Sequence, residues 1–197
     1  GCIPTKALLH DAKLLRSLES SPVFQSFPTD RIDLLNSMMA RKQKVVQEMV
    51  KGVEMLLESH RVAVRHAQAD LLSPNQVILL REQDKREIIK ADAIVLATGS
   101  KSKALPNIVP DGEKIITSDE ALETKKIPGE LIIVGGGYIG VEFATLFNTL
   151  GSKVTIVEIL ENILPGLEDE LVRNLRRFLE RYGVKILTKT KIEDLRP

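Results

Sequence analysis

The residues best suited to chemistry lie in two separate parts of the sequence. One part is Cys2, with Lys6 four positions after it. The other is the glycine-rich string Gly135–Gly140, followed by Glu142 and then by Glu158. An activated thiol is a nucleophile, and a glycine-rich turn followed by an acidic residue is typical of nucleotide binding. A reactive thiol and a dinucleotide site are therefore the two hypotheses to examine.

The string Gly135-Gly136-Gly137-Tyr138-Ile139-Gly140 matches the pattern G-x-G-x-x-G. The pattern alone is weak evidence, but here the apolar run Leu131–Val134 precedes it and an amphipathic stretch follows it. The first glycine permits a tight turn, the second lets a pyrophosphate approach the backbone, and the third lets helix and strand pack closely. The start of the following helix offers free N–H groups and a positive dipole end to the phosphates. The sequence thus predicts a dinucleotide-binding turn.

Glu158 ends the next predicted strand, 18 residues after Gly140. A carboxylate at this place can accept hydrogen bonds from the adenosine ribose and would repel a 2′-phosphate, which favours NAD over NADP. Two alternatives stay open. FAD uses the same fingerprint, and a glycine-rich turn in a sheet protein can also hold no nucleotide.

Cys2 stands at the predicted start of a helix, with Pro4 in its first turn. The helix dipole acidifies a thiol in that position, and Lys6, one turn further on, can add positive charge. These features make a reactive thiolate plausible, although a terminal cysteine taken alone is more often incidental.

The elements that would position these residues follow from the pattern of apolar side chains. Helices are predicted over 4–20 and over 34–58, the second with an apolar stripe of Leu35, Met39, Val46, Met49, Val50, Val53 and Leu57. Short runs rich in Val, Ile and Leu then predict a small antiparallel meander that ends in a buried strand: 62–64, 77–80, 87–89 and 93–96. Ser73-Pro74-Asn75 is a turn signal within it.

From residue 131 the pattern is easier to interpret. Strands are predicted over 131–134, 153–158 and 184–187, and helices over 138–150 and 168–182, stopped by Gly151 and Gly183. Ile139, Phe143, Leu146, Phe147 and Leu150 are predicted to face inward. The order β-α-β-α-β is one mononucleotide-binding half of a doubly wound sheet. We therefore expect an α/β fold.

Composition narrows the function classes. The 28 basic and 27 acidic residues give a net charge of +1, so no charge excess suggests nucleic acid or an anionic membrane as a partner. No apolar run is long enough to span a bilayer, and we expect neither a membrane segment nor a metal site. The single cysteine, Cys2, suits a reducing compartment. The start at Gly1 and the abrupt end at Pro197 suggest a piece of a longer protein.

The string Gly1–His10 resembles the redox-active helix of the class I pyridine nucleotide-disulfide oxidoreductases. The resemblance implies that Cys2 is the second of two active-site cysteines, the one that touches the flavin as a thiolate. The first would stand five positions earlier, before Gly1. Lys6 matches the lysine near the flavin, and Glu142 matches the glutamate that pairs with it.

Further matches follow in the order of the family. Ala97-Thr98-Gly99-Ser100 resembles its second flavin-contacting turn, and Ala69 falls where the backbone approaches FAD. Thr117–Leu122 resembles the crossing into the NAD domain. The stretch from Gly135 to Glu158 resembles the family's NAD domain. The resemblance implies that the following residues bind the dinucleotide: Gly135, Gly136, Gly137, Tyr138, Ile139, Gly140, Val141, Glu142 and Glu158.

The resemblance implies part of an FAD-binding domain over 1–112, joined to a Rossmann-like NAD-binding domain over 113–197 that is incomplete at its C-terminus. Within the family, the strings around Cys2 and Gly135–Glu142 are most similar to the dihydrolipoamide dehydrogenase branch. That branch implies FAD and NAD as cofactors, a lipoyl-bearing protein or a small dithiol as substrate, and a homodimer. The location implied is the cytoplasm, or the mitochondrial matrix in a eukaryote. The alternatives are a mercuric- or glutathione-reductase-like enzyme, and a nucleotide-binding fragment without catalysis.

Several family features have no counterpart in the sequence. These are the first G-x-G-x-x-G, which cradles the FAD pyrophosphate, a later Gly-Asp turn, and the dimer domain with its His–Glu base. His10, His60 and His66 match none of these roles and are expected at the surface or at helix ends. We therefore expect the isolated chain to be inactive.

Overall fold

The computed structural model describes residues 1–23, 30–80, 86–103, 105 and 108–193. The chain divides into two compact units: Gly1–Met49 with Ser102–Pro197, and Val50–Lys101. The division falls inside one helix. Each unit is described by itself.

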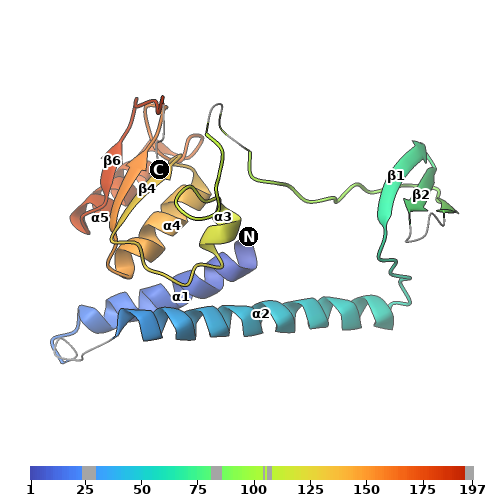
Figure 1. The fold of residues 1–197 in the computed structure, drawn as a ribbon, viewed down its shortest axis with the longest axis horizontal. Coiled ribbons are helices and arrows are strands. Elements are labelled where there is room, and N and C mark those ends of the chain that lie inside the picture. The colour runs from blue at the N-terminus through green and yellow to red at the C-terminus, as the bar shows by residue number, and fades with distance from the viewer. Residues whose placement is uncertain (24–29, 81–85, 104, 106–107, 194–197) are drawn as a thin grey trace. The chain divides into compact units, whose positions relative to one another are not determined.

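The first unit contains a parallel sheet of β4 (Glu130–Val134), β5 (Lys153–Val157) and β6 (Lys185–Leu187), in the order β4-β5-β6. Helix α4 (Tyr138–Thr149) connects the first two strands, and α5 (Asp169–Arg181) connects the last two (Figure 1). This is the predicted β-α-β-α-β half of a doubly wound fold, which confirms the α/β class. Gly151 and Gly183 end the two helices with φ of 104° and 84°, as their positions predicted.

Helix α4 packs its apolar face into the core of this unit. Phe143, Leu146, Phe147 and Leu150 are buried, as predicted. Ile139 was predicted to face inward as well, but 59% of it is exposed. It lies in the first turn of α4, at the carboxyl end of the sheet, where the strands no longer cover the helix. The periodicity was therefore right, and its extension to the first turn was wrong.

Two further helices belong to this unit. Helix α1 (Cys2–Glu19) packs along α4, and α2 (Arg31–Ser59) begins after Asp30, whose Oδ1 accepts hydrogen bonds from the N–H groups of Ile32 and Asp33. Leu8 and Ala12 of α1 and Leu35 and Met38 of α2 join the same core cluster as α4. The compact unit thus includes segments from both sides of residue 112, and the predicted boundary there stays a prediction.

The stripe predicted for α2 holds only in part. Leu35 is buried, but Met49, Val50 and Val53 are each more than half exposed. The buried positions of α2 are Leu35, Met38 and Lys42, which share one helix face three and four residues apart. None of the helices among the described residues combines the length and apolarity needed to cross a membrane.

A short helix, α3 (Ser118–Ala121), leads toward β4. Thr117 caps it: its side-chain oxygen accepts a bond from Asp119 N, and Glu120 reaches back to the Thr117 N–H at 2.6 Å. The connector between α3 and β4 begins with Leu122, which is buried, and Glu123.

The second unit contains an antiparallel sheet of β1 (Gln68–Ser73), β2 (Gln76–Leu80) and β3 (Arg86–Lys90), in the order β1-β2-β3. The meander and its turn at Ser73-Pro74-Asn75 are therefore confirmed, although β1 was not predicted. The runs 62–64 and 93–96 form no strands. Val95 is 88% exposed, so the predicted buried strand is wrong. A strand needs a partner for its N–H and C=O groups, and 93–96 pairs with no strand among the described residues.

Candidate functional site

The glycine turn between β4 and α4 is determined by sterics at two positions. Gly135 has φ of 106°, a conformation that L side chains rarely adopt, and its N–H donates to Val157 O at 2.8 Å. A Cβ on Gly140 would lie 2.1 Å from Gly135 O. Only glycine fits there, because the start of α4 packs directly on the turn. The roles predicted for the first and third glycines, a tight turn and close helix packing, agree with this geometry.

Gly137 differs from these two because the space around it is open. A Cβ there would meet no atom within 4 Å. The residue precedes α4 as its N-cap and makes no side-chain cap bond. The first N–H groups of an uncapped helix need an acceptor, and a phosphate supplies one. The turn thus leaves a cradle, formed by backbone, that fits a pyrophosphate.

Glu158 is buried at the end of β5 and is bound to the turn itself. Its Oε2 accepts a hydrogen bond from Gly136 N at 2.6 Å, and its Oε1 accepts one from Leu160 N at 2.8 Å. Each carboxylate oxygen has a second lone pair, so a ribose hydroxyl can still donate to it. The carboxylate therefore has a structural contact that sequence reasoning did not anticipate, and its role toward the ribose stays a prediction.

The loop after β5 supplies a wall that the sequence analysis missed. Ile163 is 1% exposed, and its Cγ2 would lie 2.6 Å from a Cβ on Gly136. Leu164 N donates to Gly136 O at 2.8 Å. No distinct signal in the sequence marked this wall, because the same loop also contains the apolar residues Ile159, Leu160 and Leu167, which are exposed.

Helix α1 brings Lys6 to Glu142 of α4, although the two residues are 136 positions apart. The ammonium forms an ion pair with the carboxylate, and 68% of the Lys6 side chain and 25% of the Glu142 side chain remain exposed. The hydrogen bond and the negative charge of Glu142 raise the pKa of Lys6 above its ordinary value. Glu142 lies in the first turn after the glycine cradle, so this pair joins the cysteine helix to the nucleotide turn.

Cys2 is exposed and begins α1, one turn before Lys6. The turn is closed by Thr5, whose Oγ1 donates to Gly1 O at 2.8 Å. The negative charge of an ionised Cys2 is one of the influences that raise the pKa of Lys6. Tyr138 and Ile139, predicted to contact the cofactor, are exposed in the first turn of α4, whereas Val141 is buried in the core.

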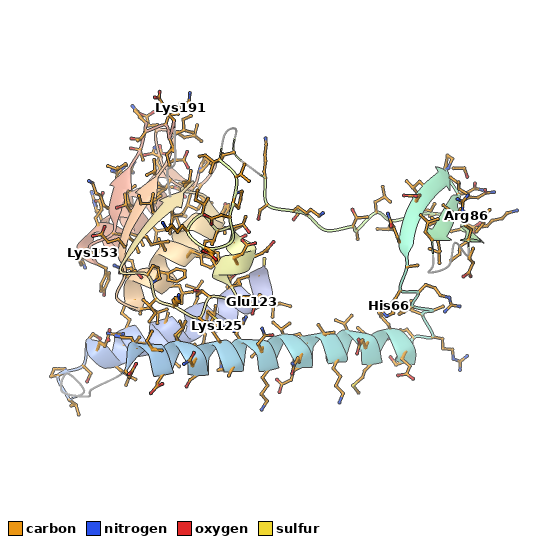
Figure 2. All side chains as sticks on the ribbon, in the orientation of Figure 1. His66, Arg86, Glu123, Lys125, Lys153 and Lys191 are labelled. Atoms are coloured by element: carbon orange, nitrogen blue, oxygen red, sulfur yellow. The ribbon has the colours of Figure 1, made fainter. Side chains whose placement is uncertain are left out.

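The remaining predicted flavin contacts belong to the second unit. Ala69 lies in β1 opposite Leu79, and Thr98, Gly99 and Ser100 are exposed. Gly99 has φ of 77°, which fits a tight turn. Their contacts with a flavin stay a prediction. His10, His60 and His66 are all exposed, and Figure 2 labels His66.

Comparisons with known proteins place the chain in a family. The family model described as pyridine nucleotide-disulphide oxidoreductase matches residues 1–197. Dihydrolipoyl dehydrogenase of Bacillus subtilis is 38% identical over 194 residues, covering 98% of this chain and 42% of that protein. Mitochondrial dihydrolipoyl dehydrogenase 1 of Arabidopsis thaliana is 34% identical over 193 residues, covering 98% of this chain and 38% of the relative.

Solved structures agree with these matches. The HOCl-induced flavoprotein disulfide reductase RclA of Escherichia coli is 30% identical, with a TM-score of 0.75, over 98% of this chain and 40% of that one. LpdA of Mycobacterium tuberculosis shares the fold, with a TM-score of 0.83 at 23% identity, over 96% of this chain and 42% of that one. The chain thus spans about two fifths of the length of these proteins. Its whole length matches the family model, and the chain belongs to the pyridine nucleotide-disulphide oxidoreductase family.

Proposed function

We propose that the chain is part of a dihydrolipoyl dehydrogenase, which oxidises dihydrolipoamide and reduces NAD. The family match and the relatives support the broader statement, a flavoprotein disulfide oxidoreductase similar to dihydrolipoyl dehydrogenase. The match also confirms the expected cofactor pair, because dihydrolipoyl dehydrogenases of this family contain FAD and use NAD. The substrate and the choice of NAD over NADP are part of the proposal for this chain.

The observation that carries the proposal is the contact between Lys6 and Glu142. It joins the helix that begins at Cys2 to the helix that begins at the glycine cradle, within one compact unit. A redox thiol and a nicotinamide must approach the same flavin if electrons are to pass between them. The ion pair holds their two helices next to each other, which supports such a relay.

The residues of the chain then take the following roles. Cys2 and a partner cysteine, joined as a disulfide, accept the two electrons of the substrate dithiol, which is itself oxidised to a disulfide. This exchange breaks the cysteine disulfide and releases Cys2 as a thiolate. FAD, when bound, relays the two electrons from the thiols to NAD. Lys6 holds a positive charge where negative charge builds up during reduction, and Glu142 orients Lys6.

The glycine cradle binds and orients the dinucleotide. The N–H groups at the start of α4 bind its pyrophosphate, and Gly137 allows close approach. The Glu158 carboxylate accepts hydrogen bonds from the ribose hydroxyls, and its negative charge repels a 2′-phosphate. We place the flavin contacts at Ala69, Thr98, Gly99 and Ser100, within a partial FAD domain over 1–112 that is followed by the NAD domain over 113–197.

A second candidate is a disulfide reductase of the same family with another substrate. The similarity to a flavoprotein disulfide reductase at 30% identity favours keeping it. A mercuric- or glutathione-reductase-like activity is the specific form to test. For the dihydrolipoyl dehydrogenase, we propose a homodimer that acts on a lipoyl-bearing protein or a small dithiol, in the cytoplasm or the mitochondrial matrix.

The test uses the longer protein that contains this chain. We expect it to reduce NAD with dihydrolipoamide and to lose this activity when Cys2→Ser is introduced. If the protein oxidises NADPH with glutathione disulfide or Hg(II) faster than it reduces NAD with dihydrolipoamide, the second candidate replaces the proposal. The isolated chain should give no turnover, and a rate on the order of 10 s⁻¹ or more would contradict its description as an incomplete catalytic unit.

A further inference from the structure

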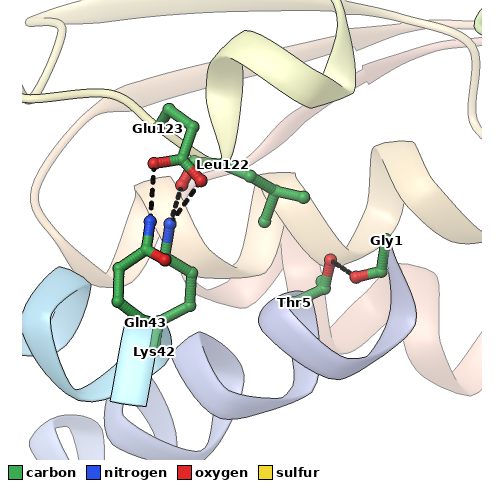
Figure 3. A network of polar contacts seen from close by, with 6 residues as sticks. All are labelled: Gly1, Thr5, Lys42, Gln43, Leu122 and Glu123. Carbon is green, nitrogen blue, oxygen red and sulfur yellow. Dashed lines mark hydrogen bonds and ion pairs between the residues drawn. The ribbon is translucent and has the colours of Figure 1, made fainter. Parts of the chain in front are cut away.

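Lys42 is a buried cation that the proposed chemistry does not use. It lies in α2, and 1% of its side chain is exposed. Its Nζ donates to Leu122 O at 2.7 Å and forms an ion pair with Glu123 Oε1 at 2.7 Å (Figure 3). Burying an ammonium group is unfavourable unless it is paired and hydrogen-bonded. An apolar side chain would fill the same space without that cost, so the lysine calls for a reason beyond packing.

The two residues next to Lys42 in the sequence, Arg41 and Gln43, contact the same connector and the neighbouring helix α1. Gln43 Nε2 donates to Glu123 Oε2 at 3.0 Å, so both oxygens of that carboxylate are bound by α2. Arg41, on the other side, donates to Ala7 O at 3.2 Å and pairs with Asp11 at 3.0 Å. Ala7 and Asp11 lie in α1. Three consecutive residues of α2, here called the α2 clamp (Arg41–Gln43), therefore hold α1 on one side and the connector at Leu122–Glu123 on the other.

The two elements that the α2 clamp holds lead directly to the candidate site. Ala7 follows Lys6 in α1, and the connector continues into β4, which ends at the glycine turn before α4. The contacts form a closed circuit: α2 holds α1, Lys6 of α1 pairs with Glu142 of α4, and the connector before β4 returns to α2. A shift of the connector relative to α2 would displace α4 relative to α1.

We propose that Lys42 is a positioning residue, which fixes the connector on α2 so that Lys6 of α1 meets Glu142 of α4. Apolar packing of Leu35 and Met38 holds the helices together but is non-directional. An ammonium group with two oxygen acceptors at 2.7 Å sets one register between the helix and the connector. The catalytic importance of the Lys6–Glu142 pair rests on the proposed function, whereas the geometric role of Lys42 does not.

A zero-length carbodiimide cross-link measures this geometry without any cofactor. The reagent activates a carboxylate, and a lysine in contact with it displaces the activator to form an amide. In the chain as it is, peptide mass spectrometry should detect the Lys6–Glu142 amide. The ion pair of Lys189 with Glu161, at 2.6 Å and remote from α2 in sequence, is the internal standard.

The variant Lys42→Met keeps the length of the side chain but removes its charge and both bonds. We expect the Lys6–Glu142 cross-link to fall several-fold relative to the Lys189–Glu161 cross-link. Lys44→Met is the matched control, because Lys44 lies on the same helix and 76% of its side chain is exposed. Among the described residues its ion-pair partner is Glu48 of the same helix, at 3.9 Å. This control should leave the ratio unchanged.

A second variant separates positioning from folding. Glu123→Gln weakens the bond to Lys42 at the exposed end of the pair, since the Glu123 side chain is 64% exposed, and it should reduce the cross-link less than Lys42→Met does. Circular dichroism identifies the temperatures at which each variant is folded. An unchanged ratio in folded Lys42→Met would overturn the proposal, as would an unchanged ratio in Glu123→Gln if Lys42→Met does not fold. Loss of enzyme activity plays no part in either outcome.

Discussion

The β-α-β-α-β half and the second unit differ in how far their apolar side chains are buried. In the first, Ile156 of β5 and Leu146 of α4 are completely buried. In the second, Leu79 is the one apolar side chain that is buried among the described residues of Val50–Lys101, while Val95 and Leu96 are 88% and 66% exposed. Both stretches contain runs of Val, Ile and Leu of similar length.

The difference lies in what each run packs against. β4, β5 and β6 hydrogen-bond side by side, α4 packs on β4 and β5, and α5 packs on β6. The central strand β5 therefore has partners for its backbone and for its apolar side chains, whereas Ile132 and Val134 of the outer strand β4 remain exposed. The antiparallel sheet of the second unit pairs its backbone, but among the described residues of Val50–Lys101 no helix packs broadly on its side chains. An apolar run therefore predicts burial only together with the element that covers it.

Substitution of two glycines gives the largest expected contrast. Gly140→Ala should destabilise the first unit by about 3 kcal/mol or more, because its Cβ would overlap Gly135 O. Gly52 is the matched control in the second unit: it lies inside α2, and a Cβ there meets no atom within 4 Å. Gly52→Ala should stabilise the helix by about 1 kcal/mol. Urea unfolding of both variants measures the contrast, which disappears if the two changes have the same sign.

Truncation of an apolar side chain in each region gives the next largest contrast. Ile156→Ala should cost about 2–5 kcal/mol, since the side chain is fully buried. Val95→Ala should change stability by less than about 0.5 kcal/mol, because the side chain is already in solvent. Comparable losses in urea unfolding would mean that Val95 is buried in solution, contrary to the comparison.

These contrasts also show which parts of the site the sequence could predict. The glycine turn was predictable because its requirements are local: φ at Gly135 and the close packing at Gly140 follow from the pattern itself. The hydrogen bond that the Gly136 N–H donates to Glu158, and the wall at Ile163, depend on the path of the chain after β5, which no motif describes. The contact of Lys6 with Glu142 was predicted from the family resemblance, not from the residues alone.

Burial of Lys42 was beyond sequence reasoning for a clear physical reason. The apolar stripe predicted for α2 excluded charged positions, and a lysine in a helix is usually exposed. Lys42 is buried because Leu122 and Glu123, about 80 residues away, supply its acceptors. The prediction for the run 93–96 was wrong in the opposite direction: Val95 and Leu96 were expected to be buried but are largely exposed.

The smallest expected effect concerns the exposed pair of Lys6 and Glu142. Glu142 raises the pKa of Lys6, so the pair stabilises the fold below the ordinary lysine pKa of 10.5 and loses this contribution as pH rises through the raised value. Glu142→Gln should therefore lower stability slightly at neutral pH, by less than about 1 kcal/mol, and the difference should vanish in strong alkali.

The pH dependence of thermal unfolding checks this prediction. Glu130→Gln is the matched control, because the pair of Glu130 with Lys153 is 3.5 Å long and both side chains are about four fifths exposed. It should have no measurable effect at either pH. A difference for Glu142→Gln that grows in alkali would reverse the predicted sign and contradict the pairing.

Titration calorimetry of the isolated chain with NADH and with NADPH tests the dinucleotide site most directly. Glu158→Gln is the variant of choice, because Ala would leave the N–H groups of Gly136 and Leu160 without their acceptor. We predict tighter binding of NADH than of NADPH, and a narrower gap between them in Glu158→Gln, since the charge that repels the 2′-phosphate is gone. Equal affinity of the unmodified chain for the two nucleotides would contradict the account.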